Sequence, residues 1–367
     1  MFIVRADFRC LLYDFIVNAY DWIVLNTTVY LPIAGIEFNA LILLAIGLCV
    51  GILGGFFGVG GAWIVTPALM IFKMPAPFAI GTDLAHIMGK SIVSTRKHWK
   101  MGNVDWKLGI ISNIGTVIGV EMGAQLIMIL KNMGGDIVGT SVRYTYIVLL
   151  IGLGSFMLYD YFVIRKRKAA GTATIQNGKK SLVQKIRDIN IPPFMSFEKS
   201  GIEKISVWII IFIFFFTGFL SGYLGVGGGF IRMPALIYLL GCPTAIAVGT
   251  DLFVVFLDGA YGCFTYGMKG TVEILAAIIM LMGAAVGAQI GVTAVKYIKG
   301  YGIRLLFAIM ILFAGISIIL SQIYSVTNIA WIDTASAVVI MGASLVMSGI
   351  IFVKLVRAFK KEKEATM

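Results

Sequence analysis

The chain has 367 residues, of which 59% are hydrophobic and 13% charged, and its mean hydropathy is +0.95. Soluble domains are about 45–50% apolar and about 25% charged, so the composition excludes a cytosolic enzyme, a secreted disulfide-linked domain and a nucleic-acid-binding protein. It indicates an all-α polytopic membrane protein. Most of the net charge of +12 lies in residues 165–204, with ten basic and three acidic residues, and in residues 354–364, with five basic and two acidic residues. This clustering is typical of a topology signal.

In chain order, the first 35 residues alternate apolar runs with charged residues such as Arg5, Asp7 and Arg9. We expect an amphipathic helix at the membrane interface there, in preference to a span. The hydrophobic segments that follow lie at residues 38–58, 60–73, 76–98, 106–130, 143–164, 205–224, 227–241, 243–266, 272–295, 302–322 and 329–353.

Two of these segments, 60–73 and 227–241, are shorter than the roughly 20 residues that a spanning helix needs. Both are bounded by glycine or proline, which predicts discontinuous helices buried within the protein.

The chain contains an internal repeat. The 19 residues from Gly51 align with the 19 residues from Gly218 at eleven identical positions, and Gly-Thr-Asp-Leu recurs at 81–84 and 249–252. This similarity predicts a duplicated half. The basic bias of corresponding loops is reversed between the halves, which favours two inverted halves of five segments plus a final helix. Inverted halves require each short segment to cross the membrane. If the short segments are re-entrant instead, the two halves are parallel.

The predicted organisation has six parts. They are an interfacial segment (1–35), a first transmembrane repeat (36–164), a basic cytoplasmic linker (165–204), a second repeat (205–324), an additional helix (325–353) and a basic cytoplasmic tail (354–367).

These motifs resemble the TauE/SafE family of sulfite and organosulfur-anion exporters. The residues that carry the resemblance are the paired GVGG turns at 58–61 and 225–228, the Pro-Ala-Leu runs from Pro67 and Pro234, and the two Gly-Thr-Asp-Leu runs. The resemblance covers residues 38–322 and implies a secondary carrier for small sulfur-containing anions such as sulfite, sulfoacetate or a related sulfonate. It implies nothing for the linker or the first 35 residues.

The GVGG turns suit an anion, because glycine lets the backbone approach a ligand and the following helix presents free N–H groups. We expect Gly60, Gly61, Gly227 and Gly228 to bind substrate. The alternative is close helix packing through small residues.

Polar residues follow each turn. Thr82 and Thr250 are candidates either for anion contact or for helix capping. Asp83 and Asp251 are candidates for helix capping or for proton coupling, since ionisable groups at membrane depth are costly and usually functional.

Lys90 lies two turns after Asp83, with His86 on the same helix face, and its counterpart in the second half is Asp258. Lys90 is a candidate to bind the anion or to neutralise Asp258. Its alternative is a snorkelling position at the cytoplasmic edge. His86 is a candidate for proton coupling or for plain packing.

Further candidates lie outside this face. Arg232 replaces Val65 of the first half and could bind a sulfonate through two hydrogen bonds or lie at the interface. Gln125 and Gln289 occupy matched positions and suit either anion contact or interhelical hydrogen bonds. Glu121 has no acidic counterpart and is a candidate proton carrier.

The sequence therefore predicts a carrier in a bacterial or archaeal cytoplasmic membrane, with linker and C-terminus cytoplasmic, coupled to protons or to the anion gradient. The alternatives are an anion channel or a carrier of a non-sulfur organic anion. We expect no enzymatic activity, no cofactor and no metal. The expected partners are the small anion and membrane lipid, without nucleic acid, and a homodimer is left open.

Overall fold

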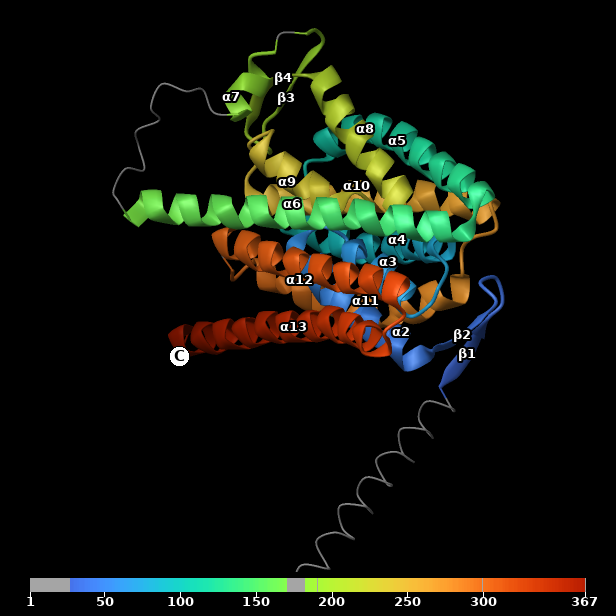
Figure 1. Cartoon of the computed structure of the whole chain (residues 1–367). Coiled ribbons are helices and arrows are strands. Elements are labelled where there is room, and N and C mark those ends of the chain that lie inside the picture. The colour runs from blue at the N-terminus through green and yellow to red at the C-terminus, as the bar shows by residue number, and fades with distance from the viewer. Residues whose placement is uncertain (1–26, 170–181, 190, 299, 367) are drawn as a thin grey trace, which may run out of the picture.

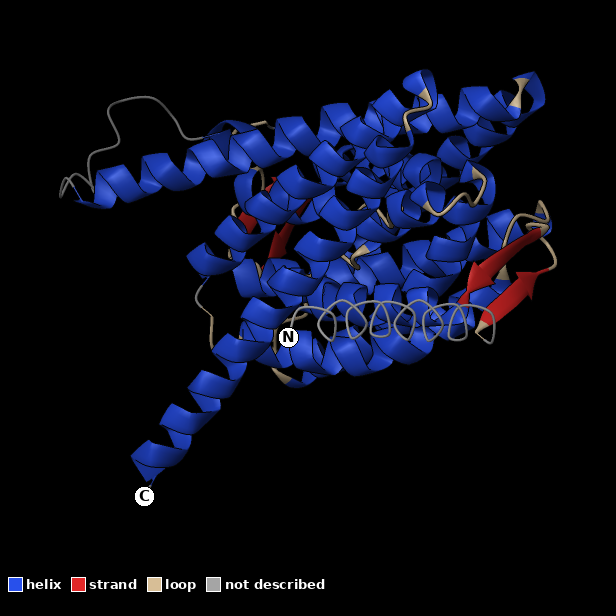
Figure 2. Cartoon of the chain, turned by 60° about the horizontal axis from the view of Figure 1, so that its bottom comes forward, coloured by secondary structure: helices blue, strands red, loops and turns tan. Residues whose placement is uncertain are grey.

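A computed structural model gives the structure of the chain and describes residues 27–169, 182–189, 191–298 and 300–366. Within these residues, eight helices are long and apolar enough to cross a membrane. The all-α membrane fold expected from composition is confirmed, with two short hairpins added (Figures 1 and 2). Most of the predicted interfacial segment, residues 1–26, lies outside the described residues.

The elements of the first half are β1 (Thr28–Leu31), β2 (Ile36–Asn39), α2 (Ala40–Phe57), α3 (Ala62–Ile71), α4 (Ala76–Lys100), α5 (Trp106–Met133) and α6 (Gly135–Ala169). Those that follow are α7 (Leu182–Arg187), β3 (Phe194–Phe197), β4 (Ile202–Ser206), α8 (Val207–Leu224), α9 (Gly229–Tyr238), α10 (Thr244–Met268), α11 (Ile274–Val295), α12 (Gly300–Thr327) and α13 (Ala330–Thr366). Every predicted hydrophobic segment therefore corresponds to a helix.

Each half begins with an antiparallel hairpin that the hydropathy pattern did not predict. β1 occupies residues expected at the end of the interfacial helix, β2 lies at the start of the predicted first repeat, and β3 lies within the predicted linker. The hairpin turns contain Gly35 and Gly201, whose φ angles of 67° and 66° are unfavourable for other residues. A repeated Gly-Ile-Glu at 35–37 and 201–203 is the signal for these hairpins.

The two halves exchange helices. α2 of the first half packs in parallel on α11 of the second, and α8 of the second half packs in parallel on α5 of the first. Glycines at every fourth residue make these contacts, as in Gly47, Gly51 and Gly55 on α2 and Gly283, Gly287 and Gly291 on α11. A Cβ on Gly51 would lie 2.5 Å from the carbonyl oxygen of Ala284, so the backbones themselves are in contact.

At the centre, α4 and α10 are counterparts in the repeat and run antiparallel. The start of α4 at Gly81 lies against Thr271, just after α10, and the start of α10 at Gly249 lies against Asn103, just after α4. The hairpins cap opposite ends of this pair: the β1–β2 turn donates two backbone N–H groups to Glu273 Oε2, and Ser200 after β3 donates to Asp105 Oδ2.

The short helices turn back. Phe72, just after α3, packs its ring against that of Phe38, just before α2, with 5.9 Å between the ring centroids. α3 therefore returns to the end at which α2 begins. In the second half, Leu239 after α9 lines the same surface cavity as Trp208 at the start of α8.

The helix ends next to the basic linker and the basic tail lie at the same end of the helical body. Lys97 near the end of α4 donates to the carbonyl of Gln289 near the end of α11, at 2.6 Å. Tyr297, just after α11, donates to Glu362 near the end of α13 at 2.8 Å. α6 runs antiparallel to α12 and so ends where α12 begins. α12 lies between α6 and α13 (Figure 1).

Replacing Gly51 by alanine is expected to lower the stability of the protein by about 1–3 kcal/mol, because the new methyl group forces α2 away from α11. The matched control is Gly152→Ala on α6, where a Cβ would meet nothing within 4 Å. Thermal unfolding in detergent compares the two. Equal melting temperatures for both variants would contradict the close backbone packing.

Candidate functional site

The two GVGG segments form tight turns between a long helix and a short one. All six glycines of these turns have φ between 61° and 79°, a region that other residues rarely adopt: Gly58, Gly60, Gly61, Gly225, Gly227 and Gly228. The glycines were recognised in the sequence as places where the backbone can break, and the structure breaks the helices there.

The turns meet where α4 crosses α10. A Cβ on Gly60 would lie 2.8 Å from Val255 Cγ1, and a Cβ on Gly227 would lie 3.1 Å from the same methyl. Ile87 of α4 lies against both glycines as well. The structure therefore brings both turns, and with them the starts of α3 and α9, to the centre of the protein.

α3 and α9 begin without a capping side chain among the described residues. Their N-caps are Gly61 and Gly228. The first N–H groups of a helix have no partner within it and form the positive end of the helix dipole. Both helix starts therefore favour negative charge.

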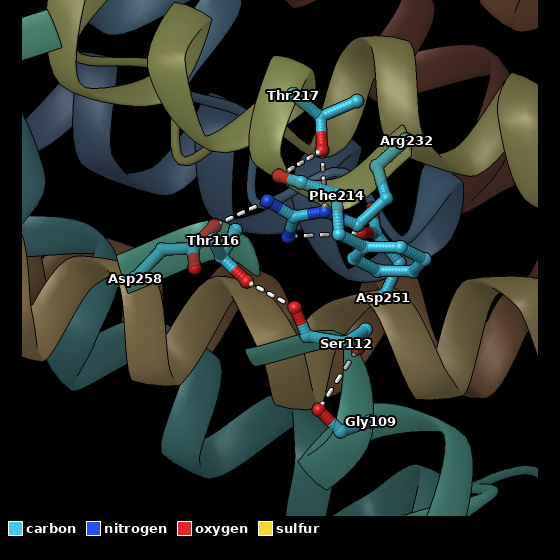
Figure 3. A network of polar contacts seen from close by, with 8 residues as sticks. All are labelled: Gly109, Ser112, Thr116, Phe214, Thr217, Arg232, Asp251 and Asp258. Atoms are coloured by element: carbon cyan, nitrogen blue, oxygen red, sulfur yellow. Dashed lines mark hydrogen bonds and ion pairs between the residues drawn. The ribbon is translucent and has the colours of Figure 1, made fainter. Parts of the chain in front are cut away.

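In the second half, this charge comes from the protein. Arg232 of α9 is fully buried, and its guanidinium pairs with Asp251 Oδ1 at 3.3 Å and forms a short contact with Asp258 Oδ2 (Figure 3). Its Nε donates to Thr217 Oγ1 at 3.4 Å, and the ring of Phe214 lies 5.4 Å from the guanidinium carbon. The cation is thus held from several sides.

The first half has a different set of charges. Asp83 Oδ2 accepts hydrogen bonds from the backbone N and the hydroxyl of Thr66, at 3.1 and 2.9 Å, and so ties α4 to α3. His86 Nδ1 lies 3.6 Å from Asp83 Oδ1. Lys90 is fully buried, and its ammonium has no hydrogen-bond partner among the described residues. Neither Asp83 nor Asp251 caps the start of its own helix.

The hypothesis that Lys90 neutralises Asp258 is wrong for this structure, because Asp258 pairs with Arg232. Arg232 is also not at the membrane interface, since its side chain is wholly buried. The reason is geometric: a residue at the Val65 position of the repeat can reach the carboxylates of α10 in its own half. Lys90 does not snorkel to the edge either, as none of its surface is exposed.

Thr82 and Thr250 hold the halves together. Thr82 Oγ1 accepts from the backbone N of Glu273, and Thr250 Oγ1 accepts from the backbone N of Asp105, both at 2.9 Å. Glu273 and Asp105 are the N-caps of α11 and α5 and occupy matched positions in the repeat. The structure therefore uses both threonines in contacts between the halves.

Three predicted residues lie on the outside of the helical body. The side chains of Gln125 and Gln289 are exposed. Glu121 is half-buried and binds Gln125, Tyr261 and Thr265. The structure does not bring these residues to the turns.

One polar face of α4 was not predicted from the sequence. Beyond Lys90, four side chains on α4 are buried and each leaves a polar atom without a hydrogen-bond partner in the described part of the chain: Ser91, Ser94, Thr95 and His98. Together with Asp83, His86 and Lys90 they form a polar stripe along one side of α4, from the turns to the basic end. Their spacing of three and four residues is the signal that could have found them.

Within the described residues, no group of three or more His, Cys, Asp or Glu side chains could hold a metal ion.

Comparisons with known proteins match most of this chain. A family model described as sulfite exporter TauE/SafE matches residues 43–318. The probable membrane transporter protein YunE of Bacillus subtilis is 29% identical over 292 residues, which cover 77% of this chain and 98% of that protein. A probable membrane transporter protein of Methanocaldococcus jannaschii is 26% identical over 304 residues, covering 78% of this chain and 98% of its own. No solved structure matches the chain.

Replacing Arg232 by methionine is expected to destabilise the protein by about 3–5 kcal/mol, because Asp251 and Asp258 would be left buried without their cation. The double variant Arg232→Met/Asp258→Asn removes one of the stranded charges and should recover part of the loss. Thermal unfolding measures both. A melting temperature of Arg232→Met equal to that of the unmodified protein would show that the pair is unimportant for stability.

Proposed function

The chain belongs to the TauE/SafE family of membrane transporters, and we propose that it is a secondary carrier that moves a small sulfur-containing anion, such as sulfite, sulfoacetate or a related sulfonate, across the cytoplasmic membrane. The relatives are named as transporters, which supports transport and not catalysis. The family description supports the sulfur-containing class of substrate.

The observation that carries the proposal is the meeting of two uncapped helix starts with two buried cations at the centre of the protein. Glycine turns open the backbone there, and free N–H groups favour an oxyanion. Lys90 adds a charge-assisted donor that has no hydrogen-bond partner in the described residues. An apolar substrate would gain nothing from these groups.

A carrier is favoured over an open channel. An open pore exposes its polar lining to water, whereas the polar stripe of α4 is buried from Asp83 to His98. In this conformation the central site is therefore closed to solvent. Release of the anion requires a conformational change, which is the defining feature of a carrier.

The two halves have opposite orientations in the proposed transporter. The antiparallel course of α4 and α10 and the hairpins at opposite ends support this arrangement. Because α3 turns back beside α2, the chain leaves this pair of helices on the side of the membrane where it entered. The three long helices that follow the short helix in each half then make three crossings. The halves can thus be inverted without short spanning segments. The end that gathers the basic segments is the cytoplasmic one.

Single cysteines at Glu37 and Lys204, both exposed and on the second strands of the two hairpins, test the orientation. In a chain whose native cysteines are replaced, an impermeant maleimide should label Glu37→Cys in intact cells and Lys204→Cys only after permeabilisation. Lys354→Cys on α13 is the control and should behave as Lys204→Cys does. Labelling of both hairpins from the same side would contradict inverted halves.

Purified protein in liposomes should show saturable uptake of radiolabelled sulfite and counterflow, in which internal unlabelled sulfite accelerates uptake. The same assay with thiosulfate, sulfoacetate, acetate and phosphate defines the substrate class. Imposing a pH gradient tests proton coupling. Flux that rises linearly with concentration would indicate a channel, and counterflow with acetate or phosphate alone would indicate a non-sulfur anion.

A further inference from the structure

The two halves place a cation at equivalent points but supply it from different sequence positions. A Cβ on Gly61 would lie 3.1 Å from Lys90 Nζ, and a Cβ on Gly228 would lie 2.5 Å from Arg232 Nη2. Gly61 and Gly228 are counterparts in the repeat and begin α3 and α9. Each short helix therefore starts beside a buried positive charge.

The counter-charges are not equivalent. Around the start of α9, Arg232 faces two carboxylates, Asp251 and Asp258. Around the start of α3, Asp83 is the counterpart of Asp251, but Lys90 occupies the position of Asp258. The second half therefore has one more negative charge than the first. Both helix starts carry a similar dipole, so the first half lacks one anion relative to the second.

The cation without a hydrogen-bond partner in the described residues lies in the half that has one carboxylate fewer. Lys90 is fully buried, and its ammonium finds no hydrogen-bond partner in the described residues. Leaving such a group without a partner is costly in a membrane. The guanidinium of Arg232, by contrast, uses three donor nitrogens on Thr217, Asp251 and Asp258.

We propose that the transported anion binds in the first half alone, between the Lys90 ammonium and the N–H groups that open α3, and that Asp258 is the built-in counterpart of that anion in the second half. The protein then takes one anion at a time. This inference rests on the proposed function and adds to it the site and the stoichiometry.

The first test removes the cation. Lys90→Met keeps the length and apolar stem of the side chain without its charge. Calorimetric titration of the purified protein with sulfite should give one site in the unmodified chain and about ten- to a hundredfold weaker binding in the variant, as expected for a lost charged hydrogen bond. Lys90→Arg, which keeps the charge, should retain measurable binding. Undiminished affinity in Lys90→Met would overturn the inference.

The second test exchanges the charge patterns of the halves. Val65→Arg/Lys90→Asp gives the first half the arginine and the second aspartate of the other half, so it should fold and bind no sulfite. The triple variant Arg232→Val/Met233→Thr/Asp258→Lys gives the second half the residues that the first half has at positions 65, 66 and 90. It should raise the number of sulfite ions bound per protein from one to two. Sulfite binding by the first variant would overturn the inference, as would a single site in a folded second variant.

The two failures are distinguishable. Sulfite counterflow that persists in Lys90→Met would leave the proposed function intact and reject the site. Binding of acetate or phosphate alone, lost in Lys90→Met, would support the site and reject the sulfur-containing substrate. If no anion of the panel binds the unmodified protein, both proposals fail.

Discussion

A buried charge in a membrane needs a partner, and the centre of this protein depends on how that requirement is met. In the second half the partners come from the protein, since Arg232 pairs with both Asp251 and Asp258. In the first half it leaves Lys90 without a hydrogen-bond partner within the described chain. A duplicated fold thus contains one network in which the cation is paired with two carboxylates and one in which the cation has no hydrogen-bond partner among the described residues. This asymmetry is the basis for the anion site that we propose in the first half.

The rest of the architecture holds this centre in place. Glycine stripes bring α2 against α11 and α5 against α8 at backbone contact, so each long pair joins the two halves. The hydrogen bonds of Thr82 with Glu273 and of Thr250 with Asp105 join the halves again at the ends of α4 and α10. The short helices α3 and α9 are attached through glycine turns. The start of α3 is the one that the proposed anion would contact.

Much of this could be predicted from the sequence, because hydrophobic length and the GVGG repeat are strong local signals. The helices and the broken turns follow from them. Side-chain partners do not, since the reach of Arg232 to Asp258 depends on how α9 lies on α10. Gln125 and Gln289 illustrate the limit: their conservation between the halves suggested a site, but repeat symmetry also preserves outward-facing residues. The hairpins were not predicted because strands of four or five residues have little hydropathy signal.

The most direct measurement of the central claim is a crystal structure of the protein soaked with selenite, an analogue of sulfite whose selenium is located by anomalous scattering. Binding in the first half alone predicts one selenium peak beside Lys90 at the start of α3. A peak beside Arg232 at the start of α9, or equal peaks in both halves, would contradict it. So would the absence of a peak at a selenite concentration that inhibits sulfite counterflow.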